Sequence, residues 1–121
     1  MAKSQKKIPK KAAVKKTKHL ERAALAALTT NLSAATDVTI TFTSGLGQAT
    51  ASLFRKGLLI NMQSISMSGV IHFSDVQPGD VVGINGVCTG SATININSIT
   101  VPATPTNFGA GPFNVIYGVL G

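Results

Sequence analysis

The chemistry most directly available to this sequence is the neutralisation of phosphate by lysine. Residues 1–22 carry nine basic side chains against the single acid Glu21, a net charge of +8, whereas residues 23–121 carry two basic side chains against three Asp, a net charge of −1. Irregularly spaced lysines neutralise phosphates without reading bases. The candidate nucleic-acid-binding residues are therefore Lys3, Lys6, Lys7, Lys10, Lys11, Lys15, Lys16, Lys18 and Arg22.

A second interpretation of this basic segment is a solubilising or targeting tail with no defined partner, because many runs of like charge are only solvated. The rest of the chain shows no aromatic pair for stacking bases, so any nucleic-acid binding is expected to be non-specific, and DNA is not distinguished from RNA. Residues 1–18 are rich in Lys, Ala, Ser and Gln. This composition predicts a basic arm that is disordered when free.

Catalytic chemistry has few candidates after residue 35: Asp37, Asp75, Asp80, His72 and Cys88. Asp75 and Asp80 flank a Pro-Gly turn, where an Asp side chain is expected to cap backbone N–H groups. His72 alternates with apolar neighbours, so we expect it to face away from the core, without the companions that a metal site needs. Cys88 has no cationic neighbour and is predicted to be a small buried hydrophobe. We therefore predict a protein that is not an enzyme and that holds no metal and no cofactor.

The elements that position these residues change at about residue 36. Within residues 19–35, Leu20, Ala24, Leu28 and Leu32 recur every four residues, which predicts a short amphipathic helix and a linker. From residue 36 the apolar period becomes two, as in Val38, Ile40 and Phe42, which alternate with threonines. We therefore expect three segments: a disordered arm (1–18), a helix and linker (19–35), and a β domain (36–121).

Apolar stretches separated by turn residues predict about seven short strands in the β domain, typical of a small antiparallel sandwich or barrel. Arg55-Lys56-Gly57 and Pro78-Gly79-Asp80 are expected to be turns, and Asn85-Gly86 gives the strongest short-range hairpin signal. A proline-containing loop then leads to a final strand over 113–120. This strand is expected to complete its own sheet or to pair with the edge of a neighbouring molecule.

The stretches 51–57 (ASLFRKG) and 69–80 (GVIHFSDVQPGD) resemble transthyretin-like sandwich modules, which include carboxypeptidase-regulatory-like domains and the B-type repeats of collagen adhesins. The resemblance covers about residues 38–97 and implies an Ig-like or transthyretin-like β-sandwich in which Phe73 and Val76 fill the core. Some adhesin repeats form a Lys–Asn isopeptide bond assisted by a buried acid. Lys56 lies in an apparent turn and no Glu follows Glu21, so we do not expect that crosslink here.

Three classes of function remain open. The first is a nucleic-acid-binding protein whose β domain is a structural or oligomerisation unit, and the second is a self-associating or adhesin-like module whose arm is a tail. The third is attachment to an anionic membrane surface through the arm and the leucine stripe beside it. No apolar run reaches the ~20 residues that span a bilayer, and the short apolar stretch 23–28 does not match a secretory signal, so a cytoplasmic location is expected.

Overall fold

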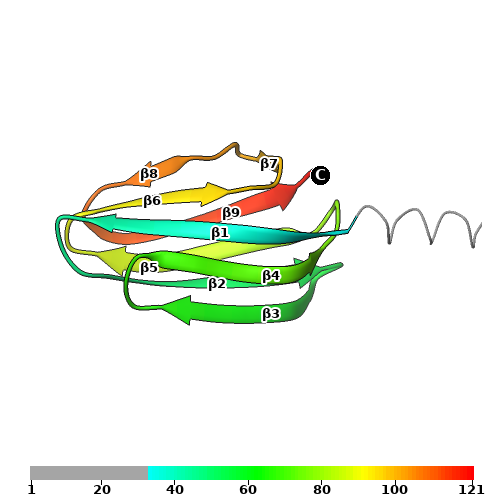
Figure 1. Cartoon of the computed structure of the whole chain (residues 1–121), viewed down its shortest axis with the longest axis horizontal. Coiled ribbons are helices and arrows are strands. Elements are labelled where there is room, and N and C mark those ends of the chain that lie inside the picture. Colours follow the sequence, from blue (N-terminus) through cyan, green and yellow to red (C-terminus); the bar gives the residue numbers. More distant parts are fainter. Residues whose placement is uncertain (1–32) are drawn as a thin grey trace, which may run out of the picture. The chain divides into compact units, whose positions relative to one another are not determined.

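The computed structural model describes residues 33–121, which form a sandwich of two antiparallel sheets (Figure 1). The strands are β1 (Ala34–Thr43), β2 (Gly47–Arg55), β3 (Leu58–Ile65), β4 (Gly69–Val76), β5 (Val81–Cys88), β6 (Ser91–Ile96), β7 (Thr100–Val101), β8 (Thr106–Phe108) and β9 (Gly111–Val119). Sheet A has the order β4-β1-β6-β8, and sheet B has the order β3-β2-β5-β9-β7. The prediction of a small antiparallel β-sandwich is confirmed at this level.

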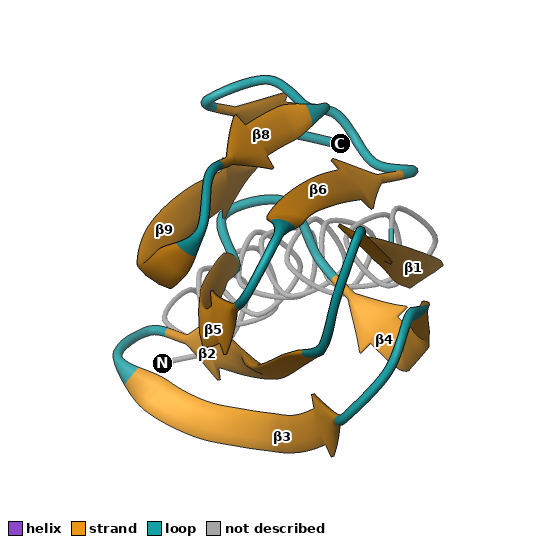
Figure 2. Ribbon diagram, turned by 90° about the vertical axis from the view of Figure 1, so that its left-hand side faces the viewer, coloured by secondary structure: helices purple, strands orange, loops and turns teal. Residues whose placement is uncertain are grey.

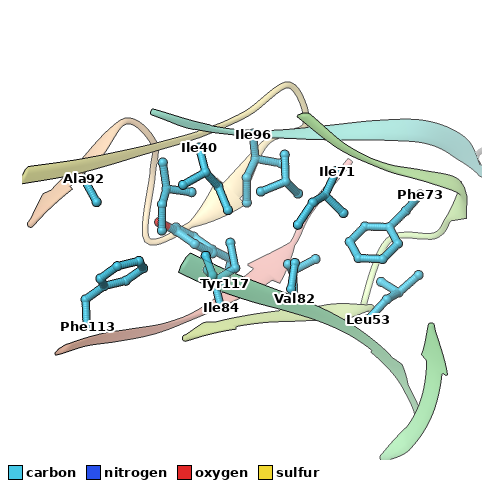
Figure 3. Packing of buried hydrophobic residues seen from close by; sticks show 14 of the residues in the cluster. Ile40, Leu53, Ile71, Phe73, Val82, Ile84, Ala92, Ile96, Phe113 and Tyr117 are labelled. Atoms are coloured by element: carbon cyan, nitrogen blue, oxygen red, sulfur yellow. The ribbon is translucent and has the colours of Figure 1, made fainter. Parts of the chain in front are cut away.

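The core lies between the two sheets and is made by the alternating apolar residues of their inner faces. In Figure 3, Ile40, Ile71, Phe73 and Ile96 of sheet A point toward Leu53, Val82, Ile84 and Tyr117 of sheet B. Each of these eight side chains is at most 4% exposed. The period-two pattern therefore selects the buried face of each strand, as expected for a sheet with one face on the core.

The turn between β2 and β3 is a two-residue hairpin loop. Lys56 and Gly57 both have positive φ, at 53° and 81°. Positive φ at both central positions is the type I′ geometry, whose twist matches the flanking strands. The predicted Arg55-Lys56-Gly57 turn is confirmed, and it closes the hairpin that carries β3 to the edge of sheet B.

The predicted hairpin at Asn85-Gly86 is wrong, because β5 runs without a break from Val81 to Cys88. Asn85 pairs with Thr50 of β2 and Asn114 of β9, so the strand has a neighbour on each side at this point. Pairing on both sides fixes an extended backbone, which overrides the local turn preference. The chain instead reverses at Thr89-Gly90 and crosses from sheet B to sheet A.

Residues 33–121 form nine strands rather than about seven. The two short strands β7 and β8 lie in the stretch that was predicted to be a proline-containing loop, and Pro112 lies within β9. The peptide bonds before Pro102 and Pro105 are cis. Strands of two and three residues carry too little alternation to be detected in a sequence.

Two further predictions concern the ends of the β domain. The last strand, β9, pairs with β5 on one side and with β7 on the other, so it completes its own sheet. At the other end, β1 begins at Ala34, inside the segment 19–35 that was assigned to a helix and linker. The predicted helix itself, over residues 19–32, lies outside the described residues.

Candidate functional site

The nine basic residues of the arm, from Lys3 to Arg22, all lie outside the described residues. Their assignment to phosphate binding therefore stays a prediction that rests on the sequence. The described residues hold two side-chain clusters with charged groups and two contrasting outer sheet faces, and these are described in turn.

The first cluster joins Arg55 of β2 to the turn between β4 and β5. The guanidinium of Arg55 binds the carboxylate of Asp80 with two hydrogen bonds, from Nε to Oδ1 at 3.0 Å and from Nη2 to Oδ2 at 2.9 Å. Arg55 Nη2 also donates to the backbone oxygen of Asp75 at 3.0 Å, and Nη1 lies 3.6 Å from Asp75 Oδ2. The hydrogen bond to Asp80 is the main cause of the raised pKa of Arg55, so the guanidinium stays charged.

The contacts of this cluster hold the turn between β4 and β5. The Asp80 side chain is only 2% exposed and also accepts a hydrogen bond from the backbone N–H of Gln77 at 2.9 Å, which is the capping role predicted for an Asp beside Pro-Gly. The backbone of Asp80 accepts from the N–H of Val119 in β9 at 2.9 Å. The role of Arg55 is not predicted by the sequence, because its partner lies 25 residues away and no local pattern joins the two residues.

The second cluster is a cross-strand pair on the outer face of sheet A. His72 Nδ1 lies 2.6 Å from Asp37 Oδ1, and the two residues are directly opposite in β4 and β1. His72 is exposed while its neighbours Ile71 and Phe73 are buried, which confirms the predicted orientation. Because both partners are about half exposed, solvent screening limits the contribution of this pair to stability.

Cys88 is 3% exposed, and its thiol donates to the backbone oxygen of Gly109 at 3.3 Å. The prediction of a small buried side chain is confirmed. Within residues 33–121, no three side chains of the types His, Cys, Asp and Glu lie close enough together to hold a metal ion. A shallow pocket of about 300 Å³ near Cys88 is lined largely by Leu46, Gly47 and Val87 and offers no charged group.

The outer face of sheet A is mostly polar and uncharged. Strand pairing sets Thr39 beside Asn95 and Thr41 beside Thr93, and Thr93 Oγ1 donates to Asn107 Oδ1 at 2.9 Å. Residues that lie directly opposite each other on paired strands share a face. Hydroxyl and amide side chains therefore form one continuous surface across β1, β6 and β8.

The outer face of sheet B carries no charged side chain and is apolar over part of its area, because a polar row of Ser64, Thr50, Asn85 and Asn114 also crosses it. Pairing sets Met62, Ser52, Gly83 and Ile116 in one row across the sheet. Leu59, Phe54, Val81, Gly118 and Val101 form the next row. We call the large apolar members the apolar face: Phe54, Leu59, Met62, Val81, Val101 and Ile116. Four of them are more than half exposed, namely Leu59 (53%), Met62 (59%), Val101 (59%) and Ile116 (63%).

A hollow of about 300 Å³ interrupts the apolar face, and it is lined by Phe54, Gly83 and Ile116 together with the polar side chains of Ser52, Asn85 and Asn114. Gly83 supplies no side chain there, and the ring of Phe54 lies over it, 3.7 Å from the position that a Cβ would take. Exposed apolar patches of this kind are typical of surfaces that contact another protein. The two sheets therefore differ in that the larger exposed apolar side chains gather on part of the outer face of sheet B.

The single tyrosine provides a pH test of the core. Tyr117 is fully buried and donates to Thr106 Oγ1 at 2.7 Å. Burial raises the pKa of Tyr117, and the hydrogen bond with Thr106 lowers it by a smaller amount. Since the folded pKa lies above that of the unfolded chain, this contribution to stability is complete below about pH 10 and is lost as the pH rises through the folded pKa.

We expect the absorbance of tyrosinate, followed during an alkaline titration, to have a higher midpoint in the folded chain than in the urea-unfolded chain. Thr106→Val should raise the midpoint further, because the threonine hydroxyl no longer stabilises the phenolate. Equal midpoints in the folded and unfolded chains would contradict the burial of Tyr117.

Among the residues that the structure describes, no helix is long and apolar enough to cross a membrane. No family model matches the chain, and no curated protein or solved structure matches it either, so the resemblance to transthyretin-like modules stays a prediction.

Proposed function

We propose that this chain is a non-enzymatic assembly protein. In this proposal the lysine-rich arm binds nucleic acid through phosphates, without sequence preference, and the sandwich is the structural unit that associates. The observation that carries the proposal is the separation of charge, with +8 in residues 1–22 and −1 in the remainder. A nearly neutral domain lets many arms gather on one polyanion without repulsion between the folded units.

The described surfaces support a structural role for the sandwich. In one charged cluster, Arg55 and Asp80 hold a turn, and in the other, His72 and Asp37 form a cross-strand pair. The apolar face offers a broad surface for a protein neighbour rather than a deep cavity for a small molecule. We retain a transthyretin-like sandwich as the finer fold assignment, on the residues that carry the resemblance.

The test is purification of the full chain at low and at high salt, with the ratio of absorbance at 260 and 280 nm and nuclease sensitivity as readouts. We expect nucleic acid to co-purify at low salt and to leave at high salt. On duplex DNA the logarithm of affinity should fall with the logarithm of salt concentration, with a slope of about −0.9 per phosphate contacted. Replacing the eight arm lysines by Gln should abolish binding, whereas the matched change Lys56→Gln in the β2–β3 turn should leave it unchanged.

The alternative is a self-associating structural module whose arm is a solubilising or targeting tail. The apolar face favours this alternative, because such a surface can contact another protein molecule without nucleic acid. Protein free of nucleic acid at both salt concentrations, or binding that does not change with salt, would reject the phosphate-binding proposal and favour this alternative.

A further inference from the structure

Each of the two sheets has two edges, and the four edges differ in how well they are protected. Edge strands expose unpaired N–H and C=O groups, and natural proteins shorten, charge or cover them to prevent unwanted pairing. The edge strand β7 has two residues, and the edge strand β8 has three, with Pro105 immediately before it. Neither strand is long enough to form a stable set of backbone hydrogen bonds with a strand of another molecule.

The third edge strand, β4, has eight residues but is partly covered by side chains from sheet B. Gln63 Nε2 donates to the backbone oxygen of His72 at 2.8 Å, and Arg55 Nη2 donates to that of Asp75 at 3.0 Å. The strand also carries the ionisable side chains of His72 and Asp75. These features restrict the pairing of β4 with another strand.

The fourth edge strand, β3, is neither short nor charged, and a register shift against β2 between Leu53 and Phe54 is the one irregularity in its pairing. Its eight residues (LLINMQSI) include no charged residue, no Pro and no Gly. Its backbone pairs with β2 on one side, and it forms the outer border of sheet B (Figure 2). Leu58, Leu59, Ile60 and Met62 are 47–69% exposed along it. This length of open, apolar strand needs an extended partner, because only a strand supplies matching backbone groups along its length.

We propose that β3 pairs antiparallel with β3 of a second copy of this chain across a two-fold axis, joining two copies of sheet B into one continuous sheet. A strand is its own hydrogen-bonding complement when it runs antiparallel to an identical strand. At the two-fold axis each residue would lie near its own copy, so a charged residue would face a like charge. β3 contains no charged residue and avoids this repulsion. This inference rests on the proposed function only for the reason why two copies associate. The pairing itself is argued from the properties of β3.

This pairing also extends the apolar face. Met62 lies on the outer face of sheet B, opposite Ser52, and Leu59 lies opposite Phe54. A register that sets outward residues opposite outward residues keeps both apolar faces on the same side of the joined sheet. The dimer therefore carries one apolar surface of doubled width, centred on the residues of β3.

The test is sedimentation velocity on the full chain, after nuclease treatment and in high salt, over a concentration series. We expect a reversible dimer. Met62→Lys should weaken dimerisation by about 100-fold, since the substitution occurs twice at a two-fold interface and each copy accounts for about tenfold in lost apolar contact. The matched control Val70→Lys, on β4 and at a similarly exposed position (55% against 59%), should leave the dimer intact. A wild-type monomer at every concentration, or equal dissociation in both variants, overturns the proposal.

Hydrogen exchange of the wild-type chain gives a second measurement that needs no variant. Backbone amides of β3 should become more protected as concentration rises, while those of β4 should not change. Protection of β3 that is independent of concentration overturns the proposal. A dimer that disappears when nucleic acid is removed also overturns it, while leaving phosphate binding by the arm intact. A dimer that persists in a chain without affinity for nucleic acid supports it and counts against the proposed function.

Discussion

Arg55→Met is expected to lower the free energy of unfolding by about 3–5 kcal/mol, because it leaves the carboxylate of Asp80 buried without its cation. The Asp80 side chain is 2% exposed, and Arg55 supplies two of its hydrogen bonds. For a domain of this size such a loss corresponds to a fall of more than about 12 °C in the unfolding midpoint. Thermal or urea unfolding followed by circular dichroism measures it.

The neighbouring residue provides the matched control. Lys56→Met removes a positive charge from the exposed β2–β3 turn but leaves the Arg55–Asp80 pair in place, and should change stability by less than about 0.5 kcal/mol. The double variant Arg55→Met with Asp80→Leu removes both charges and should recover a large part of the loss. If Arg55→Met costs less than about 1 kcal/mol, the Arg55–Asp80 pair does not hold the turn.

The second large effect is expected at Gly86, which the sequence had suggested was a turn residue. A Cβ at this position would lie 2.2 Å from the backbone oxygen of Gln48 and 2.6 Å from Cζ of Phe113. The strand therefore needs glycine for the close approach of its neighbours, and not for a reversal of the chain. Gly86→Ala should cost about 3 kcal/mol or more through overpacking, measured by the same unfolding experiments.

Gly83, three residues earlier in β5, is the control for Gly86. A Cβ at Gly83 would find its nearest atom, Cε2 of Phe54, at 3.7 Å, which is an ordinary contact, so Gly83→Ala should be nearly neutral. Adding Phe113→Leu to Gly86→Ala should not restore stability, because the clash with the backbone oxygen remains. A Gly86→Ala variant as stable as Gly83→Ala would contradict the packing described for β5.

The sequence predicts those parts of the fold where local alternation and burial agree. Val38 and Ile40 in β1, and Ile94 and Ile96 in β6, alternate with threonine and asparagine, and the structure buries them. The prediction fails at Asn85-Gly86, because a strand paired on both sides outweighs a local turn preference. It also misses β7 and β8, which are held by pairing with β9 and β6 rather than by any pattern of their own.

For the candidate sites too, local features are predicted and distant partners are missed. The roles of His72, Asp80 and Cys88 follow from their immediate neighbours, so a local reading of the sequence predicts them. The partners Arg55 and Asp37 lie 25 and 35 residues away from Asp80 and His72, and only the crossing of the chain between the sheets brings them together. The open edge at β3 was missed for the same reason, because an edge is a property of strand order and not of composition.

The order in which the chain is synthesised gives the position of β9 a further consequence. β5 lies between β2 and β9, but β9 follows it only after β6, β7 and β8 have been made. In a partly folded chain whose β9 has not yet paired, β5 is therefore a second open edge of sheet B, with the apolar residues Val81, Val82 and Ile84 along it. Such a chain has two open edge strands in sheet B instead of one, so the pairing of β9 removes a site of aggregation.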